Sequence, residues 1–227
     1  MEKSILQYST KLDLVYQILK EEIIHGELPP NTQLLISQVA NRFQVSVTPV
    51  REAIKRLESE GLVEVTAHSK AKVSLPSIKE LKEMLEVRLS LELLSISLSY
   101  KNIGEDELYD LKELINKMYQ AYQQEDEEEY GVLDKKFHMY LHERSQNSYL
   151  FRLILDLYAK TERTRGVFKI NPQRMNKSIQ QHNQMVKCLE EGDEEKLIEI
   201  AEKHRKEANK MLLDFYEEYI ENNSFTQ

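Results

Sequence analysis

The order of hydrophobic and polar positions divides the chain into two parts. In the first 75 residues, apolar side chains such as Leu12, Val15 and Leu19 recur every three or four positions, which is the period of an amphipathic helix. Nearer residue 75, apolar and polar side chains alternate, which is the period of a half-buried strand. The pattern predicts three helices followed by a hairpin, over residues 12–24, 37–43, 47–60, 62–65 and 71–75.

From residue 77 onward the apolar positions keep helical spacing, and no strand-like alternation competes with it. Turn-forming residues interrupt this spacing near residues 102–104, 124–126, 146–147, 171–172 and 192–193. These interruptions leave about six helices, and the short connections between them favour an antiparallel bundle. The predicted fold class is therefore mainly α, with three helices and a hairpin first and an all-helical bundle of about six helices after them.

The change of pattern near Leu75 and Pro76 predicts two domains. A chain of 227 residues is long enough for two, because domains commonly contain roughly 100 to 150 residues. Hydrophobic residues make up 41% of the chain, with only six glycines and five prolines, so each domain can form a core. The predicted segments are a first domain at 1–75, a linker at 76–79, a helical domain at 80–221 and a tail at 222–227.

The charged residues are unevenly distributed. The chain carries 31 Lys and Arg residues against 39 Asp and Glu residues, a net charge of −8, and the whole acidic excess falls after residue 75. Between residues 42 and 56, in contrast, four basic side chains stand against Glu52 alone. A small basic patch on an acidic protein is typical of a domain that binds nucleic acid.

The cysteine content and the most apolar stretch bear on location. Cys188 is the single cysteine, so no internal disulfide can form, and the N-terminus lacks the features of a secretory signal. The most apolar stretch, residues 84–100, is interrupted by charged side chains and falls short of the roughly 20 apolar residues of a membrane span. We expect a cytoplasmic protein without a membrane partner.

The order of helix, tight turn, helix and hairpin is that of a winged helix-turn-helix, whose second helix presents its first residues to the major groove of DNA. Ser46, Thr48 and Arg51 stand at the start of that helix, and their polar groups suit phosphates and base edges. In an arbitrary helix, Arg51 is more often a solvated charge paired with an acid. The opposite face of the helix is apolar and consists of Val50, Ala53, Ile54 and Leu57.

The run at residues 45–63, VSVTPVREAIKRLESEGLV, resembles the signature of GntR-type transcriptional regulators. Residues 26–31 fit the same family, with Asn31 where a glycine is usual. The resemblance implies a winged helix-turn-helix that binds operator DNA, with its wing tip in the minor groove. The residues that it assigns to DNA binding are Ser46, Val47, Thr48, Arg51, His68, Ser69 and Lys70.

Two of these positions depart from the family pattern. Val47 stands where the family typically carries an arginine that reads a guanine, and Ser69 replaces the usual glycine of the wing. Because a valine side chain can contact the methyl group of thymine, we expect a more A·T-rich half-site.

An acid and three histidines are candidates for a metal site in the helical part. Asp134 and His138 are four residues apart and project from one helix face toward a common point. His182 precedes the turn at 192–193 and His204 follows it at a similar distance, so an antiparallel helix pair brings the two imidazoles level. Such a set suits one divalent transition metal per chain, Zn²⁺, Ni²⁺ or Mn²⁺, with positions left open for a ligand. Taken singly, each histidine is more often an ordinary structural or surface residue.

The spacing of these residues resembles the FCD-type effector domain of the FadR subfamily, and a count of six helices favours its VanR-like branch. The resemblance implies that Arg88 faces a ligand pocket, where it could hold a small carboxylate effector through two hydrogen bonds. The alternative for Arg88 is a structural salt bridge to a neighbouring helix. The metal ligands that the resemblance implies are Asp134, His138, His182 and His204.

Together these features predict a metal- and ligand-responsive transcriptional regulator rather than an enzyme. We expect a repressor that binds double-stranded operator DNA as a homodimer, because a two-fold dimer matches a palindrome. The alternative is a metal-dependent hydrolase or isomerase with an appended DNA- or protein-binding domain, since open metal sites also activate water. That alternative lacks a motif such as His-Glu-x-x-His to supply a general base. A helical scaffold with incidental histidines is a third possibility.

Overall fold

The computed structural model describes residues 10–24, 27–66, 70–162 and 172–224. The chain divides into two compact units, Met1–Ser77 with Ala159–Val167, and Ile78–Tyr158 with Phe168–Gln227. Each unit has its own hydrophobic core. No helix in the described part of the chain is long and apolar enough to cross a membrane.

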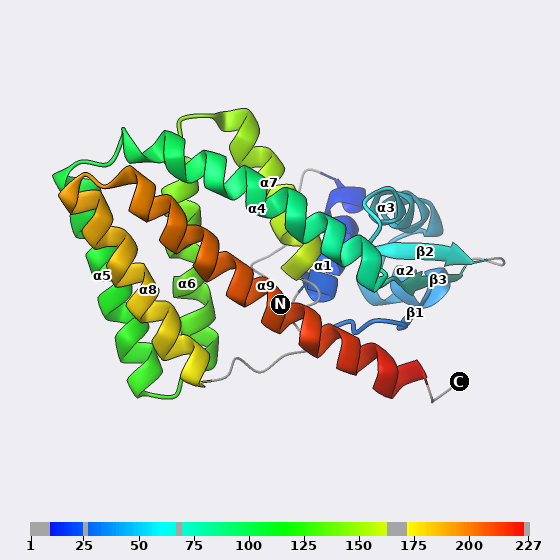
Figure 1. Ribbon diagram of the computed structural model, residues 1–227. Coiled ribbons are helices and arrows are strands. Elements are labelled where there is room, and N and C mark those ends of the chain that lie inside the picture. The colour runs from blue at the N-terminus through cyan, green and yellow to red at the C-terminus, as the bar shows by residue number, and fades with distance from the viewer. Residues whose placement is uncertain (1–9, 25–26, 67–69, 163–171, 225–227) are drawn as a thin grey trace. The chain divides into compact units, whose positions relative to one another are not determined.

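The first unit contains three helices and a small sheet (Figure 1). The helices are α1 (Lys11–Ile24), α2 (Ile36–Phe43) and α3 (Val47–Ser59). The strands are β1 (Gln33–Leu35), β2 (Val63–Thr66) and β3 (Lys70–Val73), in the spatial order β1-β3-β2 with both pairs antiparallel. This order of elements confirms the winged helix-turn-helix predicted from the sequence.

Strand β1 was not predicted from the hydrophobic pattern. It pairs with β3, with Leu34 opposite Ala71, and the chain just before it is held by reciprocal backbone bonds. The N–H of Asn31 donates to the carbonyl of Val73 and the N–H of Val73 donates to the carbonyl of Thr32, both at 2.9 Å. Three residues are too few to show alternation, and their pairing depends on a partner far along the chain.

The core of the first unit joins the apolar faces of its helices to the inner face of the sheet. These are the faces that the periodic spacing marks as apolar, so the amphipathic pattern explains why α1 packs against α3. The hairpin closes the core with Leu62, Val63, Ala71 and Val73, each at most 2% exposed. The fully buried helical side chains include Val15, Leu19, Val50, Ala53 and Leu57.

Two short connections fix where α3 begins and ends. Gln44 turns the chain between α2 and α3 with φ +53°, and Ser46 then occupies the N-cap position of α3 without a side-chain bond to the helix. Helix α3 therefore begins directly after Ser46. After α3, Gly61 adopts φ +68°, a left-handed conformation that glycine reaches without strain.

Residues 78–224 form six helices in the described part of the chain (Figure 1). Helix α4 packs against α6 and α9, α5 against α6 and α8, and α8 against α9. Four of the five predicted interruptions fall between helices, and the fifth, at 171–172, includes the first residue of α8. The predicted all-helical bundle is confirmed. The helices are α4 (Ile78–Tyr100), α5 (Glu105–Gln123), α6 (Glu127–Glu143), α7 (Ser148–Glu162), α8 (Pro172–Glu191) and α9 (Glu194–Ser224).

Helical structure extends beyond both ends of the predicted helical domain, residues 80–221. Helix α4 begins at Ile78, inside the predicted linker 76–79, and α9 ends at Ser224, inside the predicted tail 222–227. Helical ends fray gradually, and sequence periodicity locates them only to within a few residues.

A tight turn places α8 and α9 side by side. Gly192 adopts φ +73°, and the Oδ1 atom of Asp193 accepts a hydrogen bond from the N–H of Lys196 at 3.0 Å, which caps α9. The chain reverses at this turn, and the two helices run antiparallel in contact (Figure 1). Residues at similar distances before and after Gly192 therefore face one another.

Asn31 gives a test of the first unit, because it adopts φ +69°. This left-handed conformation costs most L-residues roughly 1 to 2 kcal/mol but suits glycine and is tolerated by asparagine. We expect Asn31→Ala to lower the free energy of unfolding by about 1 kcal/mol, and Asn31→Gly to change it little. Urea unfolding followed by circular dichroism measures both. Equal losses in the two variants would mean that the asparagine side chain, not the backbone conformation, is needed here.

Candidate functional site

The start of α3 presents a polar surface to solvent. Ser46, Thr48 and Arg51 are exposed, and Val47 between them is 41% exposed. The buried face of the same helix, which includes Val50, points into the core. The structure therefore brings the four predicted helix residues onto one accessible surface, as base reading by the first turns of a helix requires.

Two of the basic side chains near this surface form ion pairs within the first unit. Arg42 at the end of α2 pairs with Glu22, and the guanidinium of Arg56 lies 3.7 Å from the carboxylate of Asp13. Both acids belong to α1, so these pairs tie α2 and α3 to α1. The basic patch counted from the sequence is correspondingly smaller, and Arg51 is the exposed arginine in the first two turns of α3.

The hairpin of β2 and β3 corresponds to the predicted wing. Lys70 begins β3 and is exposed. His68 and Ser69, which the sequence assigns to the wing tip, lie outside the described residues. The contact of the wing with DNA therefore stays a prediction.

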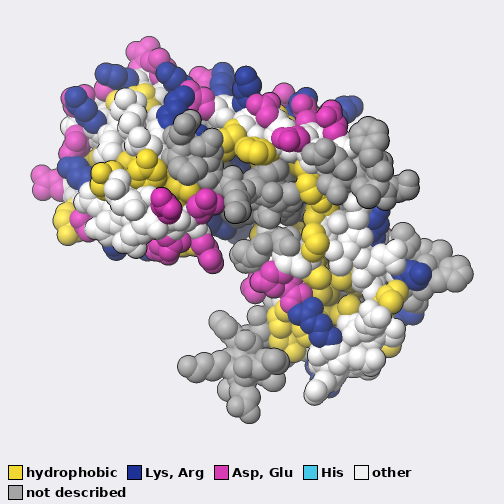
Figure 2. Space-filling view, turned by 90° about the horizontal axis from the view of Figure 1, so that it is seen from below, with side chains coloured by type: hydrophobic (Ala, Val, Ile, Leu, Met, Phe, Trp, Pro, Cys, Tyr) yellow, Lys and Arg dark blue, Asp and Glu magenta, His cyan; other side chains and the backbone are white. Residues whose placement is uncertain are grey.

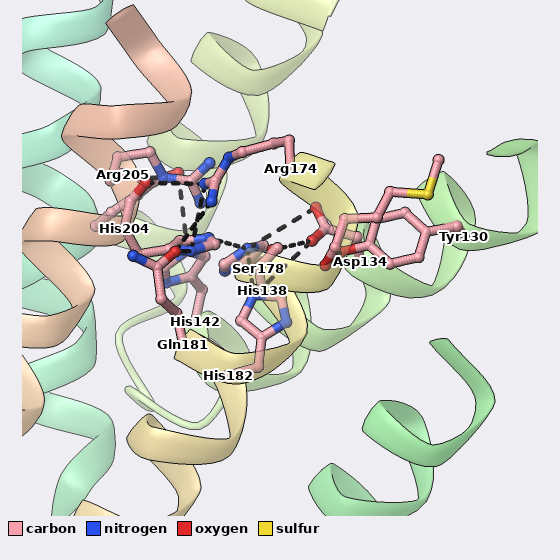
Figure 3. Close-up of polar contacts among 12 residues, drawn as sticks. Tyr130, Asp134, His138, His142, Arg174, Ser178, Gln181, His182, His204 and Arg205 are labelled. Carbon is pink, nitrogen blue, oxygen red and sulfur yellow. Dashed lines mark hydrogen bonds and ion pairs between the residues drawn. The ribbon is translucent and has the colours of Figure 1, made fainter. Parts of the chain in front are cut away.

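Three histidines from three helices converge inside the second unit (Figure 3). His138 lies on α6, His182 on α8 and His204 on α9, and each is at most 3% exposed. The Nε2 atom of His138 lies 3.3 Å from Nε2 of His182 and 3.3 Å from Nε2 of His204. The tight turn between α8 and α9 thus brings together the histidines that lie on either side of it.

The spacing of these ring nitrogens fits a shared metal ion. With metal–nitrogen bonds of about 2.0 to 2.1 Å, two imidazole ligands of one ion lie about 3.0 to 3.4 Å apart. A neutral imidazole has one N–H, so hydrogen bonds among the rings cannot satisfy both contacts of His138 through a single proton on its Nε2. A cation satisfies all three nitrogens at once. Three imidazoles with a carboxylate nearby form a donor set that suits Zn²⁺, Ni²⁺ or Mn²⁺.

A neighbouring amide fixes the tautomer of His204. Its Nδ1 atom lies 2.8 Å from Oε1 of Gln181, which only accepts, so Nδ1 carries the proton and Nε2 keeps its lone pair. The amide of Gln181 is oriented in turn, because its nitrogen donates to Glu207 at 3.0 Å and Arg174 donates to its oxygen at 3.0 Å. Outer hydrogen bonds of this kind orient metal-binding histidines. The sequence pattern did not predict Gln181 or Arg174.

Asp134 lies at the edge of the histidine cluster. Its Oδ2 atom is 3.9 Å from Nε2 of His138, and its Oδ1 atom is 3.8 Å from Nε2 of His182. The hydroxyl of Ser178 donates to Oδ1 at 3.3 Å. These separations exceed the roughly 3.0 to 3.4 Å expected between ligands of one ion, so the carboxylate stands next to the three nitrogens. Its assignment as a fourth ligand stays a prediction.

Beside the histidines, the carboxylate of Glu92 bridges two arginines. The Nε atom of Arg88 donates to Oε1 of Glu92 at 2.8 Å, and Nε of Arg205 lies 2.6 Å from Oε2. The three side chains are at most 5% exposed. The salt bridge considered for Arg88 thus lies within its own helix, α4, while the neighbouring helix α9 supplies a second arginine. Arg205 was not predicted from the sequence.

His142 completes the buried group. It is fully buried, its Nε2 atom lies 3.9 Å from Oε1 of Glu92, and neither ring nitrogen has a hydrogen-bond partner among the described residues. A cavity of about 10 Å³ lies between Glu92, His142, His138 and apolar side chains, which is about the space of one water molecule. The four described histidines are enclosed, and none is visible among the described residues on the face shown in Figure 2.

Burial and neighbouring charges set the protonation states. Burial, helped by the Arg205 cation, lowers the pKa of His142 and that of His182 to about 4, and lowers the pKa of His138 well below its usual value. Burial alone would raise the pKa of Glu92, but the two guanidiniums outweigh it and lower the pKa to about 2. At neutral pH His138, His142 and His182 are therefore neutral, and the carboxylate of Glu92 is ionised.

Comparison with known protein families identifies the chain. Residues 12–73 match the gntR family of bacterial regulatory proteins, and residues 83–207 match the FCD domain. The protein therefore belongs to the GntR family of transcriptional regulators that carry an FCD domain, in keeping with the FadR and VanR branch.

The relatives are transcriptional regulators. The chain is 27% identical to the regulator McbR of Escherichia coli (strain K12) over 179 residues, 78% of this chain and 81% of McbR. It is 24% identical to the repressor RspR of the same organism over 206 residues, 90% of each chain. The solved structure of E. coli McbR/YncC gives a TM-score of 0.77 at 25% identity, covering 92% of this chain and 100% of McbR. A GntR regulator of Rhodococcus sp. RHA1 shares the fold, with a TM-score of 0.72 at 20% identity over 90% of this chain and 98% of that one.

The buried neutral histidines make the metal-free fold sensitive to acid. In the unfolded chain a histidine takes up a proton near pH 6.5, whereas folded His142 and His182 do so only near pH 4. The contribution of these two histidines to stability is therefore constant above this window. It becomes unfavourable as the pH drops from 6.5 to about 4, by about 3 kcal/mol for each histidine.

We expect the urea midpoint of the metal-free protein to fall between pH 7 and pH 4.5, and to fall less steeply in His142→Gln. The comparison of the two slopes is the measurement, because it cancels the contributions of all other groups. A variant with the wild-type slope would mean that His142 is as easily protonated in the folded chain as in the unfolded one.

Proposed function

We propose that this protein is a repressor whose affinity for operator DNA depends on a divalent transition metal and a small carboxylate bound in its helical domain. The observation that carries the proposal is the convergence of three buried imidazole nitrogens in a chain whose first unit is a winged helix-turn-helix. FCD domains often bind metal, and RspR is a repressor, which supports both parts. In this proposal residues 1–75 form the DNA-binding domain and residues 80–221 form the effector-binding domain. Residues 76–79 link the two domains.

The DNA-binding part of the proposal uses the exposed start of α3. Hydroxyl and guanidinium groups there can bond to phosphates and base edges in the major groove, and the methyl groups of Val47 can contact a thymine. The wing then reaches the minor groove. The residues proposed to contact DNA are Ser46, Val47, Thr48, Arg51, His68, Ser69 and Lys70.

In the effector part, His138, His182 and His204 hold the metal and Asp134 is the fourth donor. A bound divalent metal supplies a Lewis-acid position for an oxygen atom of the ligand. Arg88 orients the carboxylate through its N–H groups. A ligand that favours one arrangement of the bundle by about 1 to 3 kcal/mol changes operator affinity about 5- to 150-fold.

We further propose that the protein acts as a homodimer. Two-fold symmetry matches palindromic half-sites about 34 Å apart. Helix α4 carries an exposed apolar stripe of Val87 at 53%, Leu94 at 50% and the half-buried Leu91 between them. A second copy that covers this stripe would remove apolar surface from water, which supports the assignment.

The alternative of a metal-dependent enzyme explains neither the family matches nor the exposed polar surface of α3. Both matching families are families of transcriptional regulators, and the relatives are regulators rather than hydrolases or isomerases. Catalysis would also leave the exposed surface of α3 without a role.

The metal can be tested by elemental analysis of the purified protein in chelator-free buffer. We expect about one transition metal per chain after incubation with Zn²⁺, Ni²⁺ or Mn²⁺, and at least a tenfold loss in the double variant His182→Ala, His204→Ala. His142→Gln is the matched control, because it removes a buried histidine outside the cluster and should keep the metal. Absence of metal in the wild type would remove the metal from the proposed function and leave the DNA-binding part standing.

DNA binding can be tested by selection from a random duplex library followed by binding measurements on the selected site. We expect an A·T-rich palindrome, and we expect Arg51→Ala to weaken binding at least tenfold and to reduce the salt dependence. Lys79→Ala is the control, because this 85% exposed lysine of α4 lies outside the predicted DNA-binding domain. Normal binding by Arg51→Ala would contradict the proposed docking of α3, and a G·C-containing family half-site would contradict the role of Val47.

A further inference from the structure

The carboxylate of Glu92 already makes the contact that a carboxylate effector would make. One of its oxygens accepts from Arg88 at 2.8 Å, and the other lies 2.6 Å from Nε of Arg205. Arginine–carboxylate pairs of this kind are strong and depend on geometry. A ligand carboxylate and Glu92 therefore compete for the same guanidinium.

We propose that Glu92 is an internal carboxylate that occupies the effector's position, and that a carboxylate ligand binds by displacing it from Arg88 and Arg205. The inference rests on the proposed function, because it takes Arg88 as the residue that receives the ligand. The inference goes beyond the proposed function by naming Glu92 as the residue that sets the affinity for the carboxylate ligand and the selectivity for its charge. Loss of the negative charge at this position strengthens carboxylate binding instead of weakening it.

The small space around Glu92 indicates that a ligand must replace the Glu92 side chain and cannot bind beside it. The adjoining cavity measures about 10 Å³, which holds about one water molecule and is too small for a carboxylate with its carbon atoms. A ligand can enter only when a side chain leaves. The side chain with the matching shape and charge is Glu92, and its departure exposes two cations to the incoming anion.

His142 offers the displaced carboxylate a second position. Its Nε2 atom lies 3.9 Å from Oε1 of Glu92, and both ring nitrogens have no hydrogen-bond partner among the described residues. A neutral imidazole carries one N–H that can donate to a carboxylate. Rotation of the Glu92 side chain away from both arginines and toward His142 therefore exchanges one partner for another, and the carboxylate is not left without hydrogen bonds in the core.

The rest of the cavity wall defines the class of ligand. Apart from the polar groups already named, the cavity is lined by Leu89, Leu93, Ile96, Met185 and Ala201. The carbon chain of the ligand would meet these apolar side chains, and any further negative charge beside Arg88 would meet the retained charge of Glu92. The site therefore takes a monocarboxylate with a short apolar chain, such as propionate.

The first experiment compares propionate binding to zinc-loaded wild type and Glu92→Gln by calorimetry. We expect the variant to bind propionate at least tenfold more tightly, because the amide keeps the size of the side chain and removes the competing charge. Propionamide, the neutral isostere, should show no such gain. Glu86→Gln is the matched control, since Glu86 is an exposed acid on the same helix and its variant should bind propionate like the wild type.

A second experiment covers the case in which the buried arginines destabilise the variant. In Glu92→Ala, the cavity left by the side chain can admit a small carboxylate, whose two oxygens match the guanidiniums of Arg88 and Arg205. We expect propionate to raise the melting temperature of Glu92→Ala by about 5 °C or more above its effect on the wild type. Sodium chloride at equal ionic strength should not reproduce the rise.

The outcomes separate this inference from the proposed function. If the protein binds zinc and propionate but Glu92→Gln and the wild type bind propionate equally, the displacement is wrong and the proposed effector site stands. If neither protein binds zinc or propionate, the proposed effector function itself is wrong. Equal stabilisation of Glu92→Ala by propionate and chloride would also overturn the displacement.

Discussion

The second unit depends on neutralising charges that folding removes from water. Glu92 and its two arginines are all but fully buried, and removal of one partner from such a group typically costs about 3 to 5 kcal/mol because a charge is left unpaired. The ion pair between Glu92 and Arg205 joins α4 to α9, which pack against each other. The same low exposure keeps the neighbouring imidazoles neutral, which makes them donors for a metal instead of cations.

The two candidate functional sites differ in their exposure to solvent. The polar residues at the start of α3 are exposed and are supported from behind by Val50 and its buried neighbours, so their rotamers are available to an external partner. The histidines are enclosed and held by hydrogen bonds and ring packing, as in the stacking of Phe137 on His182 at 4.2 Å. A DNA-contacting surface must be reached, whereas a metal centre must be preorganised.

Periodicity predicted most of the fold, because long amphipathic helices leave a strong pattern. It missed β1, whose pairing with β3 is decided by a distant strand. For the interior of the second unit, i,i+4 spacing and the turn at Gly192 were enough to bring Asp134, His138, His182 and His204 into one region. Spacing could not predict that Arg205 turns inward toward Glu92, since its neighbours in sequence are charged and suggest a solvated face. Contacts between helices decide whether such a charged side chain is buried, and a single sequence does not contain information on these contacts.

His204 and Arg205 are consecutive residues of α9, and both are buried. The Nε2 atom of His204 lies 3.3 Å from Nε2 of His138, and the Nε atom of Arg205 lies 2.6 Å from the carboxylate of Glu92. A single peptide unit thus connects the residue beside the proposed metal position to the residue beside the proposed carboxylate position, and a small movement of α9 shifts both. Because coupling between two binding events is reciprocal, the metal would then act as an allosteric effector of anion binding, and the metal supply of the cell would set how sensitively the regulator responds to the anion.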